Sequence, residues 1–250
     1  MSLELISIDL SNYCSKACEF CYNKSNSNGI VEWQPNEVIS FALNCAENDV
    51  KAISLGGGEP FEYEGVFQII SALTPKLFVS VTTNGLPLLD ESVFDKLMNN
   101  KPDKIHISIH NPENPDELKR ALFLIRKISK LDIRTGINLL VSANQLENAR
   151  KAVQWLYKKG MSANQIIFIP LKGTSSPSNK QIAYVAGTEN FQSTFCLTEC
   201  KRSNRFCAVS YDKKVGVCSY TETKEQLDDI TYLSLTNALN KIRTYKNCML

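Results

Sequence analysis

The stretch CSKACEFC, residues 14–21, places three thiols within eight residues, directly after an apolar alternating segment. This spacing is too tight for three independent structural cysteines and suits a loop that wraps one inorganic centre. Thiolates bind zinc and iron–sulfur clusters, but zinc sites usually recruit four protein ligands, and the two histidines lie far away, at His106 and His110. A cubane cluster held by three thiolates leaves one iron open for substrate or cosubstrate, and a zinc loop is the alternative.

The composition is that of a globular protein that can bury a full core: 250 residues, 43% hydrophobic and 22% charged. A formal net charge of +2 gives no case for nucleic acid or an acidic membrane surface as a partner. No apolar run approaches the roughly 18 to 20 residues of a membrane span, and the N-terminus lacks the basic and apolar regions of a signal peptide. We therefore expect a cytoplasmic protein that binds neither nucleic acid nor membrane.

Nine cysteines are many for a chain without a secretory signal. Three lie in the opening stretch, Cys45 stands alone, and five follow position 195: Cys196, Cys200, Cys207, Cys218 and Cys248. In a reducing compartment, clustered cysteines bind metal more often than they form disulfides. Cys45 falls in a predicted helix and is interpreted as a small core residue.

A second motif follows an apolar strand predicted at residues 51–55, which ends in the sequence GGGEP, residues 56–60. Glycines allow positive φ and let a backbone approach a ligand closely, although such a loop can also be a simple turn. The acid of this loop, Glu59, and the backbone carbonyls can accept hydrogen bonds from a cationic ammonium group.

The two motifs together resemble the radical S-adenosylmethionine (SAM) superfamily, in which a C-x3-C-x2-C loop precedes a GGE motif. The resemblance implies that Cys14, Cys18 and Cys21 bind a catalytic [4Fe–4S] cluster, whose open iron binds SAM. In this family, reduction of the cluster cleaves SAM to methionine and a 5′-deoxyadenosyl radical, which abstracts hydrogen from a substrate.

The resemblance also assigns SAM-binding roles outside the cysteines. It implies that Phe20 packs near the adenine and that Gly57, Gly58 and Glu59 bind the amino group of the methionine moiety. The turn after the third predicted strand contains Asn84 and is similar to a TNG turn of the family, with a simple turn as the alternative.

Strict alternation in residues 104–110, KIHISIH, puts three isoleucines on one face and His106, Ser108 and His110 on the other. In an α/β barrel the outer face meets helices, so the polar face is expected to point into the lumen. The resemblance implies that Ser108 contacts SAM. We predict that His110, nearest the strand end, acts on substrate as a catalytic residue; local hydrogen bonding of both histidines is the alternative.

The next predicted strand, residues 132–141, carries Arg134 and Asn138 on one face. The resemblance makes both residues candidates for binding the ribose or carboxylate of SAM.

Six predicted strands alternate with helices, at residues 3–10, 51–55, 77–82, 104–110, 132–141 and 165–170. Such alternation with short links predicts a parallel sheet with right-handed crossovers. We therefore predict an α/β fold, the partial (β/α)6 TIM-type barrel that the resemblance implies. The cysteine loop, the glycine loop and His110 fall at the carboxyl ends of strands, where parallel barrels place their chemistry.

The composition changes after Pro170, and we predict a barrel domain at 1–180 and a small cysteine-rich extension at 181–250. The extension contains a predicted hairpin at 206–218 and a predicted helix at 233–242. It resembles the SPASM and twitch extensions of radical SAM enzymes, which bind auxiliary iron–sulfur clusters. The resemblance implies one auxiliary cluster; a zinc-bound or unliganded tail is the alternative.

Four of the five tail cysteines are enough to hold one such cluster. Cys200, Cys218 and Cys248 match the family pattern best, with Cys196 or Cys207 as the fourth ligand. Cys207 alternates with apolar residues on the predicted hairpin, so a core position is its alternative interpretation.

These resemblances predict a radical SAM enzyme, an oxidoreductase that matures a ribosomally made peptide by oxidation or crosslinking. A radical dehydrogenase of a small molecule such as a sugar or aminocyclitol is the second hypothesis. A non-catalytic iron–sulfur or zinc scaffold protein is the third. The expected partners are the substrate, an electron donor such as flavodoxin or ferredoxin, and a separate peptide-recognition protein.

Overall fold

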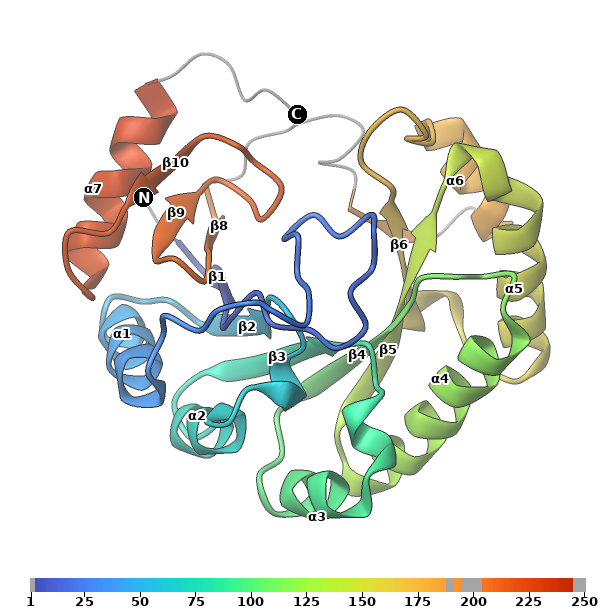
Figure 1. Cartoon of the computed structure of the whole chain (residues 1–250), viewed down its shortest axis with the longest axis horizontal. Coiled ribbons are helices and arrows are strands. Elements are labelled where there is room, and N and C mark those ends of the chain that lie inside the picture. Colours follow the sequence, from blue (N-terminus) through green and yellow to red (C-terminus); the bar gives the residue numbers. More distant parts are fainter. Residues whose placement is uncertain (1–2, 188–190, 195–203, 245–250) are drawn as a thin grey trace. The chain divides into compact units, whose positions relative to one another are not determined.

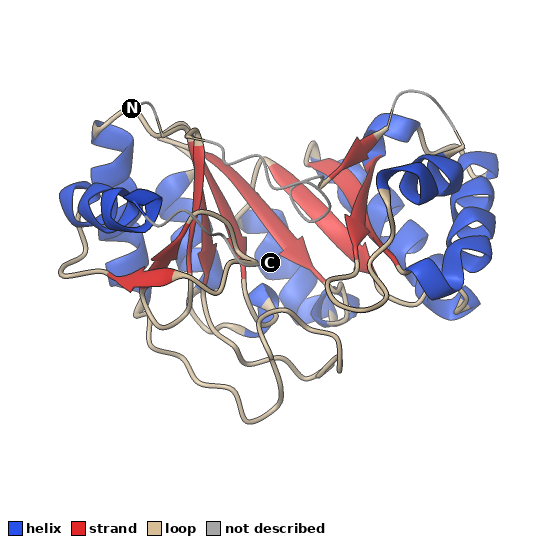
Figure 2. Cartoon of the chain, turned by 90° about the horizontal axis from the view of Figure 1, so that it is seen from above, coloured by secondary structure: helices blue, strands red, loops and turns tan. Residues whose placement is uncertain are grey.

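The computed structural model describes residues 3–187, 191–194 and 204–244 (Figure 1). The chain forms two compact units: unit 1 contains Met1–Thr83, Asp90–Asp103 and Arg202–Leu250, and unit 2 contains Asn84–Leu89 and Lys104–Lys201. Each unit is built on strands with helices against them (Figure 2). Within the described residues, no helix is long and apolar enough to span a membrane.

In the described part of the chain, unit 1 carries six strands in the order β10-β9-β8-β1-β2-β3. Its elements are β1 (Leu5–Asp9), α1 (Pro35–Glu47), β2 (Ala52–Gly56), α2 (Val66–Leu73), β3 (Phe78–Thr83), α3 (Glu91–Asn99), β8 (Phe206–Val209), β9 (Lys214–Gly216), β10 (Lys224–Gln226) and α7 (Tyr232–Thr244). Strands β8, β1, β2 and β3 are parallel, whereas β9 and β10 are antiparallel to their neighbours. The predicted extension therefore joins the sheet along β1.

Apolar and polar side chains alternate along the strands of unit 1, and the apolar face of the sheet is the one that helices cover. Ile6, Ile8 and Leu55 are fully buried, and α1 and α2 lie on one side of the strands (Figure 1). Ser7 and Ser54, which alternate with them, are only half-buried on the opposite, inner face. Packing of β-branched and leucine side chains under two helices thus leaves a polar face on the other side.

Unit 2 carries four parallel strands in the order β4-β5-β6-β7. Its elements are β4 (Lys104–Ile109), α4 (Pro115–Ile128), β5 (Arg134–Val141), α5 (Leu146–Lys158), β6 (Ile166–Pro170), α6 (Asn179–Ala186) and β7 (Gln192–Ser193). Helix α4 begins after Asn114, whose side chain accepts the backbone N–H groups of Asp116 and Glu117, with a proline at the first position. Short 3-10 turns complete the two units: η1 (Pro60–Glu62), η2 (Pro87–Leu89), η3 (Ser129–Leu131), η4 (Ala143–Gln145) and η5 (Ala163–Gln165).

The mostly parallel α/β fold class is confirmed, and all six predicted strands are present as β1 to β6. The structure also contains a helix after β6, α6, where the sequence shows only a change in composition after Pro170. Ser178 caps this helix through the N–H of Gln181, which explains how a Ser/Pro-rich segment ends in a helix. The predicted domain boundary at residue 180 stays a prediction.

Candidate functional site

The three-cysteine stretch lies in a loop, residues 12–30, that we call the cluster loop. Its base is closed by backbone hydrogen bonds: Cys14 N–H donates to Asn26 O at 3.0 Å, and Asn26 N–H donates to Asn12 O at 3.1 Å. Inside the loop, Cys21 N–H donates to Cys18 O at 3.0 Å, which forms a turn between the second and third thiols. The loop is therefore tied at its base and turned so that the three cysteines share one excursion of the chain.

The glycine loop after β2 is hydrogen-bonded directly to the cluster loop. Glu59 N–H donates to Tyr13 O at 2.9 Å. Ser15 N–H donates to Glu62 Oε2 at 2.9 Å, and the Ser15 hydroxyl also donates to the Glu62 carboxylate. The two motifs identified in the sequence thus form one local structure within unit 1.

The glycines of this loop are needed because its backbone lies very close to neighbouring residues of the chain. Gly57 and Gly58 have φ of 70° and 53°, in the left-handed region that favours glycine. A Cβ at Gly57 would lie 2.3 Å from Asp9 Cβ, and a Cβ at Gly58 would lie 2.1 Å from Tyr13 O. A side chain at Gly58 would push the two loops apart, and one at Gly57 would clash with the end of β1.

The Glu59 carboxylate is held in one orientation beneath these loops. The residue is 1% exposed, and its Oε1 accepts the Phe61 N–H at 3.1 Å and the Thr83 hydroxyl at 2.6 Å. A buried carboxylate fixed by two donors is well suited to accept a cationic donor such as an ammonium group.

In unit 2, the register of β4 and β5 places Ser108 beside Asn138. Asn138 Oδ1 is buried and has no hydrogen-bond partner among the described residues. An unsatisfied buried acceptor suggests that a ligand completes it. Arg134 lies at the amino end of the same strand, beside Lys104, and is exposed. The register therefore separates Arg134 from the Ser108–Asn138 pair.

His110 follows the last residue of β4 and contacts a buried carboxylate. Glu117 is 3% exposed; its Oε1 accepts the His110 backbone N–H at 2.9 Å and lies 3.7 Å from His110 Nδ1. Glu117 Oε2 accepts the Asn111 side chain at 3.1 Å. Sequence reasoning missed Glu117 because it sits in the first turn of a helix, where an acid is ordinary.

Residues 8–173, about two thirds of the chain, match the family model described as the radical SAM superfamily. The chain belongs to the radical SAM superfamily. The predicted assignment of the two motifs is thereby confirmed at the level of the family.

Curated relatives of this radical SAM chain include a probable GTP 3′,8-cyclase of Methanocella arvoryzae, 27% identical over 160 residues, which cover 64% of this chain and 49% of the relative. The PqqA peptide cyclase of Granulibacter bethesdensis is 22% identical over 176 residues, or 66% of this chain and 47% of that protein. The chain thus spans about half the length of these two relatives.

Solved structures share the fold of this radical SAM chain. Streptococcus suis SuiB bound to the precursor peptide SuiA has a TM-score of 0.68 at 14% identity, covering 90% of this chain and 62% of that one. The anSMEcpe structure with bound AdoMet and the Cp18Cys peptide has a TM-score of 0.69 at 18% identity, covering 98% and 82%. The similarity supports the predicted barrel-like fold.

The cysteines of the cluster loop fit the cluster that the superfamily implies. Cys14 is nearly buried, and Cys18 and Cys21 are half-buried. Among the described residues, no three Cys, His, Asp or Glu side chains converge on a single ion. Each thiolate of a cubane binds a different iron, so three thiols carried by one loop are the donor set that such a cluster needs.

Burial raises the pKa of the Cys14 thiol, and the charges of Glu59 and Glu62 act in the same direction. The backbone N–H groups of Ala17 and Lys16 donate to this sulfur and lower its pKa, but they do not outweigh the burial. The pKa of the Cys14 thiol is therefore raised on balance, and a thiol must lose its proton before it can bind metal.

Of the other predicted cofactor residues, Phe20 lies on the cluster loop and is 39% exposed. Asn84 is 5% exposed, and its Oδ1 accepts the Leu86 N–H at 2.8 Å, as expected for a turn residue. Its predicted contact with SAM stays a prediction.

Of the five tail cysteines, the structure describes Cys207 and Cys218. Cys207 is fully buried on β8, beside Ile6 on the helix-covered face, and Cys218 is 9% exposed. Cys196, Cys200 and Cys248 lie outside the described residues. The predicted auxiliary ligands therefore stay predictions.

Asp9 is a site residue that sequence reasoning missed. It ends β1 on the inner face, is 2% exposed, and accepts the Tyr22 hydroxyl at 3.4 Å. The ring of Tyr22 lies 4.7 Å from the ring of Tyr220, so the extension contacts the cluster loop. Burial raises the pKa of Asp9 to about 6. An acid at an inward position of an apolar strand was the signal that could have found it.

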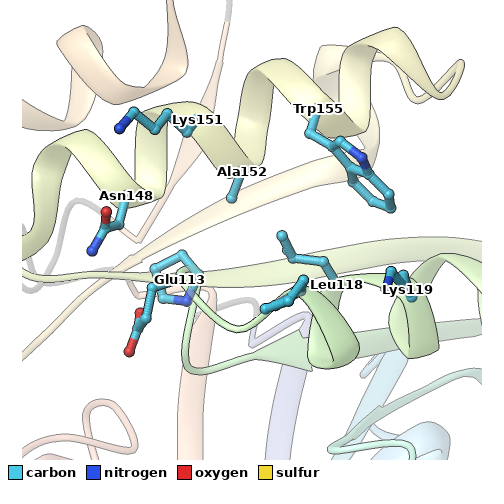
Figure 3. A pocket seen from close by; sticks show the side chains of 9 residues that line it. Glu113, Leu118, Lys119, Asn148, Lys151, Ala152 and Trp155 are labelled. Atoms are coloured by element: carbon cyan, nitrogen blue, oxygen red, sulfur yellow. The ribbon is translucent and has the colours of Figure 1, made fainter.

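A pocket of about 300 Å³ lies between α4 and α5 in unit 2 (Figure 3). Leu118 and Ala152 face each other across it, with Trp155 at one end and Glu113 at the other (Figure 3). It contains none of the predicted site residues.

Proposed function

We propose that this chain is an enzyme that reductively cleaves SAM and uses the resulting 5′-deoxyadenosyl radical to abstract hydrogen from a substrate. One observation carries the proposal: the cluster loop is hydrogen-bonded to the glycine loop above a buried, oriented Glu59 carboxylate. A scaffold protein has no need for an acceptor of an amino-acid ammonium beside its cysteines.

In this proposal each group of the chain has one task. Cys14, Cys18 and Cys21 hold the cluster, which supplies the electron for cleaving SAM when it is bound. Glu59 accepts the ammonium of the methionine moiety, and Gly57 and Gly58 let the backbone approach it. Within unit 2, the neighbouring Ser108 and Asn138 side chains offer hydrogen bonds to a ligand, and His110, held by Glu117, is the candidate catalytic residue.

We propose a peptide as the substrate, modified by oxidation or crosslinking. The support comes from neighbours in fold whose structures hold peptides, SuiB with SuiA and anSMEcpe with Cp18Cys, and from the relative named PqqA peptide cyclase. The proposal includes an auxiliary iron–sulfur cluster in a SPASM or twitch-like extension, a flavodoxin or ferredoxin as electron donor, a separate peptide-recognition protein and a cytoplasmic location.

A small-molecule dehydrogenase is the second candidate. The structure of BtrN with AdoMet and 2-DOIA has a TM-score of 0.52 and covers 98% of this chain and 85% of that one, a larger share than for SuiB or anSMEcpe. The larger share of BtrN that is covered supports this alternative, whereas the higher TM-scores support the peptide enzymes.

Anaerobic incubation of the reconstituted protein with SAM and dithionite tests the proposal. We expect 5′-deoxyadenosine to form, and to form no longer when Cys14, Cys18 and Cys21 are replaced by Ala. Loss of two hydrogens from a peptide or from a carbinol, read by mass spectrometry, separates the two candidates. If no 5′-deoxyadenosine appears even with candidate substrates present, the chain is a non-catalytic scaffold.

A further inference from the structure

One transverse row of residues crosses all six strands of unit 1. Register partners in a sheet point to the same face, so the members of the row share the inner face with Ser7. In strand order from β10 to β3, the row is Lys224, Gly216, Ala208, Ser7, Ser54 and Ser80. The barrel strands contribute three hydroxyls to this row, and the extension contributes one lysine.

The polar groups of this row are largely unused. Among the described residues, the Ser7 and Ser54 hydroxyls and the Lys224 ammonium take part in no hydrogen bond or ion pair, although all three residues are half-buried. Only Ser80 donates, to Ile53 O at 3.4 Å. Because these three residues are only half-buried, their donors remain within reach of a ligand or of water.

Gly216 and Ala208 separate Lys224 from Ser7 in the row. A Cβ at Gly216 would lie 2.6 Å from Thr221 Cγ2, 3.0 Å from Cys218 O and 3.5 Å from Lys224 Cγ, so the lysine stem lies close over this glycine. Burial raises the pKa of Asp9 and the Lys224 charge lowers it, so the ammonium is close enough to act on Asp9. Asp9 is 2% exposed whereas Lys224 is half-buried, so of these two charges the positive one is the one that a ligand can reach.

We propose that Lys224, together with the Ser7 and Ser54 hydroxyls, binds an anionic oxygen group of the substrate. Ammonium and hydroxyl groups donate hydrogen bonds, and lysine cannot accept one, so the complementary ligand is a carboxylate or a phosphate. The extension then supplies a specificity residue to the inner face of the barrel strands. The meaning of this site for catalysis rests on the proposed function, but binding at the row does not.

Thiol labelling of a Ser7→Cys variant tests the charge of the row. The reconstituted holoprotein is treated with an anionic sulfonate and a cationic trimethylammonium methanethiosulfonate, and the labelling rates of the introduced thiol are read by mass spectrometry. We expect Lys224→Met to lower the anionic-to-cationic rate ratio about fivefold or more, since a unit charge within several ångströms acts at this strength. Lys214→Met is the matched control. In the wild-type chain Asp212 holds the Lys214 ammonium at 2.6 Å, so we expect this substitution to leave the ratio unchanged. An unchanged ratio in Lys224→Met, or no labelling at position 7, overturns the proposal.

Two added anions distinguish a carboxylate from a phosphate as the anionic group of the ligand. Inorganic phosphate or N-acetylglycine at about 10 mM, roughly ten times a millimolar Kd, is added before labelling. Protection by N-acetylglycine indicates a carboxylate-bearing substrate such as a peptide, and protection by phosphate indicates a phosphorylated one. Failure of both anions to protect overturns the proposal. SAM cleavage by the same preparation is scored separately, so that a failed proposed function and a failed anion site give different results.

Discussion

At the scale of single residues, the clearest prediction concerns Glu59. Glu59→Gln keeps the size of the side chain but removes the charge that we propose to lie opposite the ammonium of SAM. We expect the Kd for SAM to rise about tenfold or more, in line with a hydrogen bond between charged groups, while the iron content stays the same. Glu64→Gln, an exposed acid five residues further along the chain, is the control. Equilibrium dialysis with labelled SAM measures both variants, and an unchanged Kd in Glu59→Gln contradicts the assignment.

Asp9 makes a prediction about stability and pH. Burial raises its pKa from 3.8 to about 6, so the folded chain holds this proton more tightly than the unfolded chain. Its favourable contribution is therefore present below about pH 4 and is lost as the pH rises to about 6. We expect Asp9→Asn to unfold with a free energy up to about 3 kcal/mol higher than wild type above pH 6, and to lose this advantage towards pH 4.

Urea denaturation at pH 4.5 and 7.5 measures this difference. Asp95→Asn, which replaces an exposed carboxylate on α3, is the control and is expected to behave as wild type at both pH values. An Asp9→Asn advantage that does not depend on pH would show that the carboxyl group is not buried in this way.

At the scale of elements, the hairpin of the extension is fixed against the start of α1. Trp33 is fully buried and donates from Nε1 to Ser210 O at 3.2 Å. Lys213, in the hairpin turn, lies 5.2 Å from the centre of the Trp33 ring, and its ammonium is 2.9 Å from the Glu37 carboxylate. These contacts join two segments that lie far apart in the chain.

Trp33→Phe removes the donor and part of the ring volume beneath the hairpin. We expect the free energy of unfolding to fall by about 1–3 kcal/mol and hydrogen exchange to rise in residues 206–218. Tyr63→Phe is the matched control, because it removes a 2.8 Å hydrogen bond to Trp33 O without touching the hairpin. If hydrogen exchange in residues 206–218 rises equally in both variants, the Trp33–Ser210 hydrogen bond is not what holds the hairpin in place.

Local pattern was enough to predict the strands but not the pairing of distant ones. The alternation of β4 and the apolar run of β6 identify strands from neighbouring residues alone. The parallel pairing of β8 with β1 joins residues about 200 positions apart, and no local period encodes it. The polar row through Ser7 and Lys224 depends on that register, so it could not be derived from the sequence. The cluster loop and Glu59 could be identified from the sequence, because their chemistry depends on the spacing of residues within short motifs.

At the scale of the whole molecule, β1 occupies a central position in unit 1. It leads into the cluster loop and is flanked by β2, which leads into the glycine loop, and by β8 of the extension. Residues 202–250 accordingly belong to the same compact unit as residues 1–83. Changes in the extension are therefore expected to reach the cluster loop through β1 and the Tyr22–Tyr220 contact.

The number of clusters is a property of the whole chain that iron counting decides. After anaerobic reconstitution, replacing Cys14, Cys18 and Cys21 by Ala is expected to leave about four irons per chain, the content of one auxiliary [4Fe–4S] cluster. In that background we expect Cys207→Ala to retain the iron, because this side chain is fully buried beside Ile6 under the helices.

Cys218→Ala in the same background should reduce the iron to near zero, since Cys218 fits the ligand pattern. Cys45→Ala, which removes another fully buried thiol, is the control for loss of iron through destabilisation alone. If the triple variant holds no iron, the extension is not an iron–sulfur site. If Cys207→Ala loses iron and Cys45→Ala does not, Cys207 is a ligand, and β8 must then move away from β1 when the cluster binds.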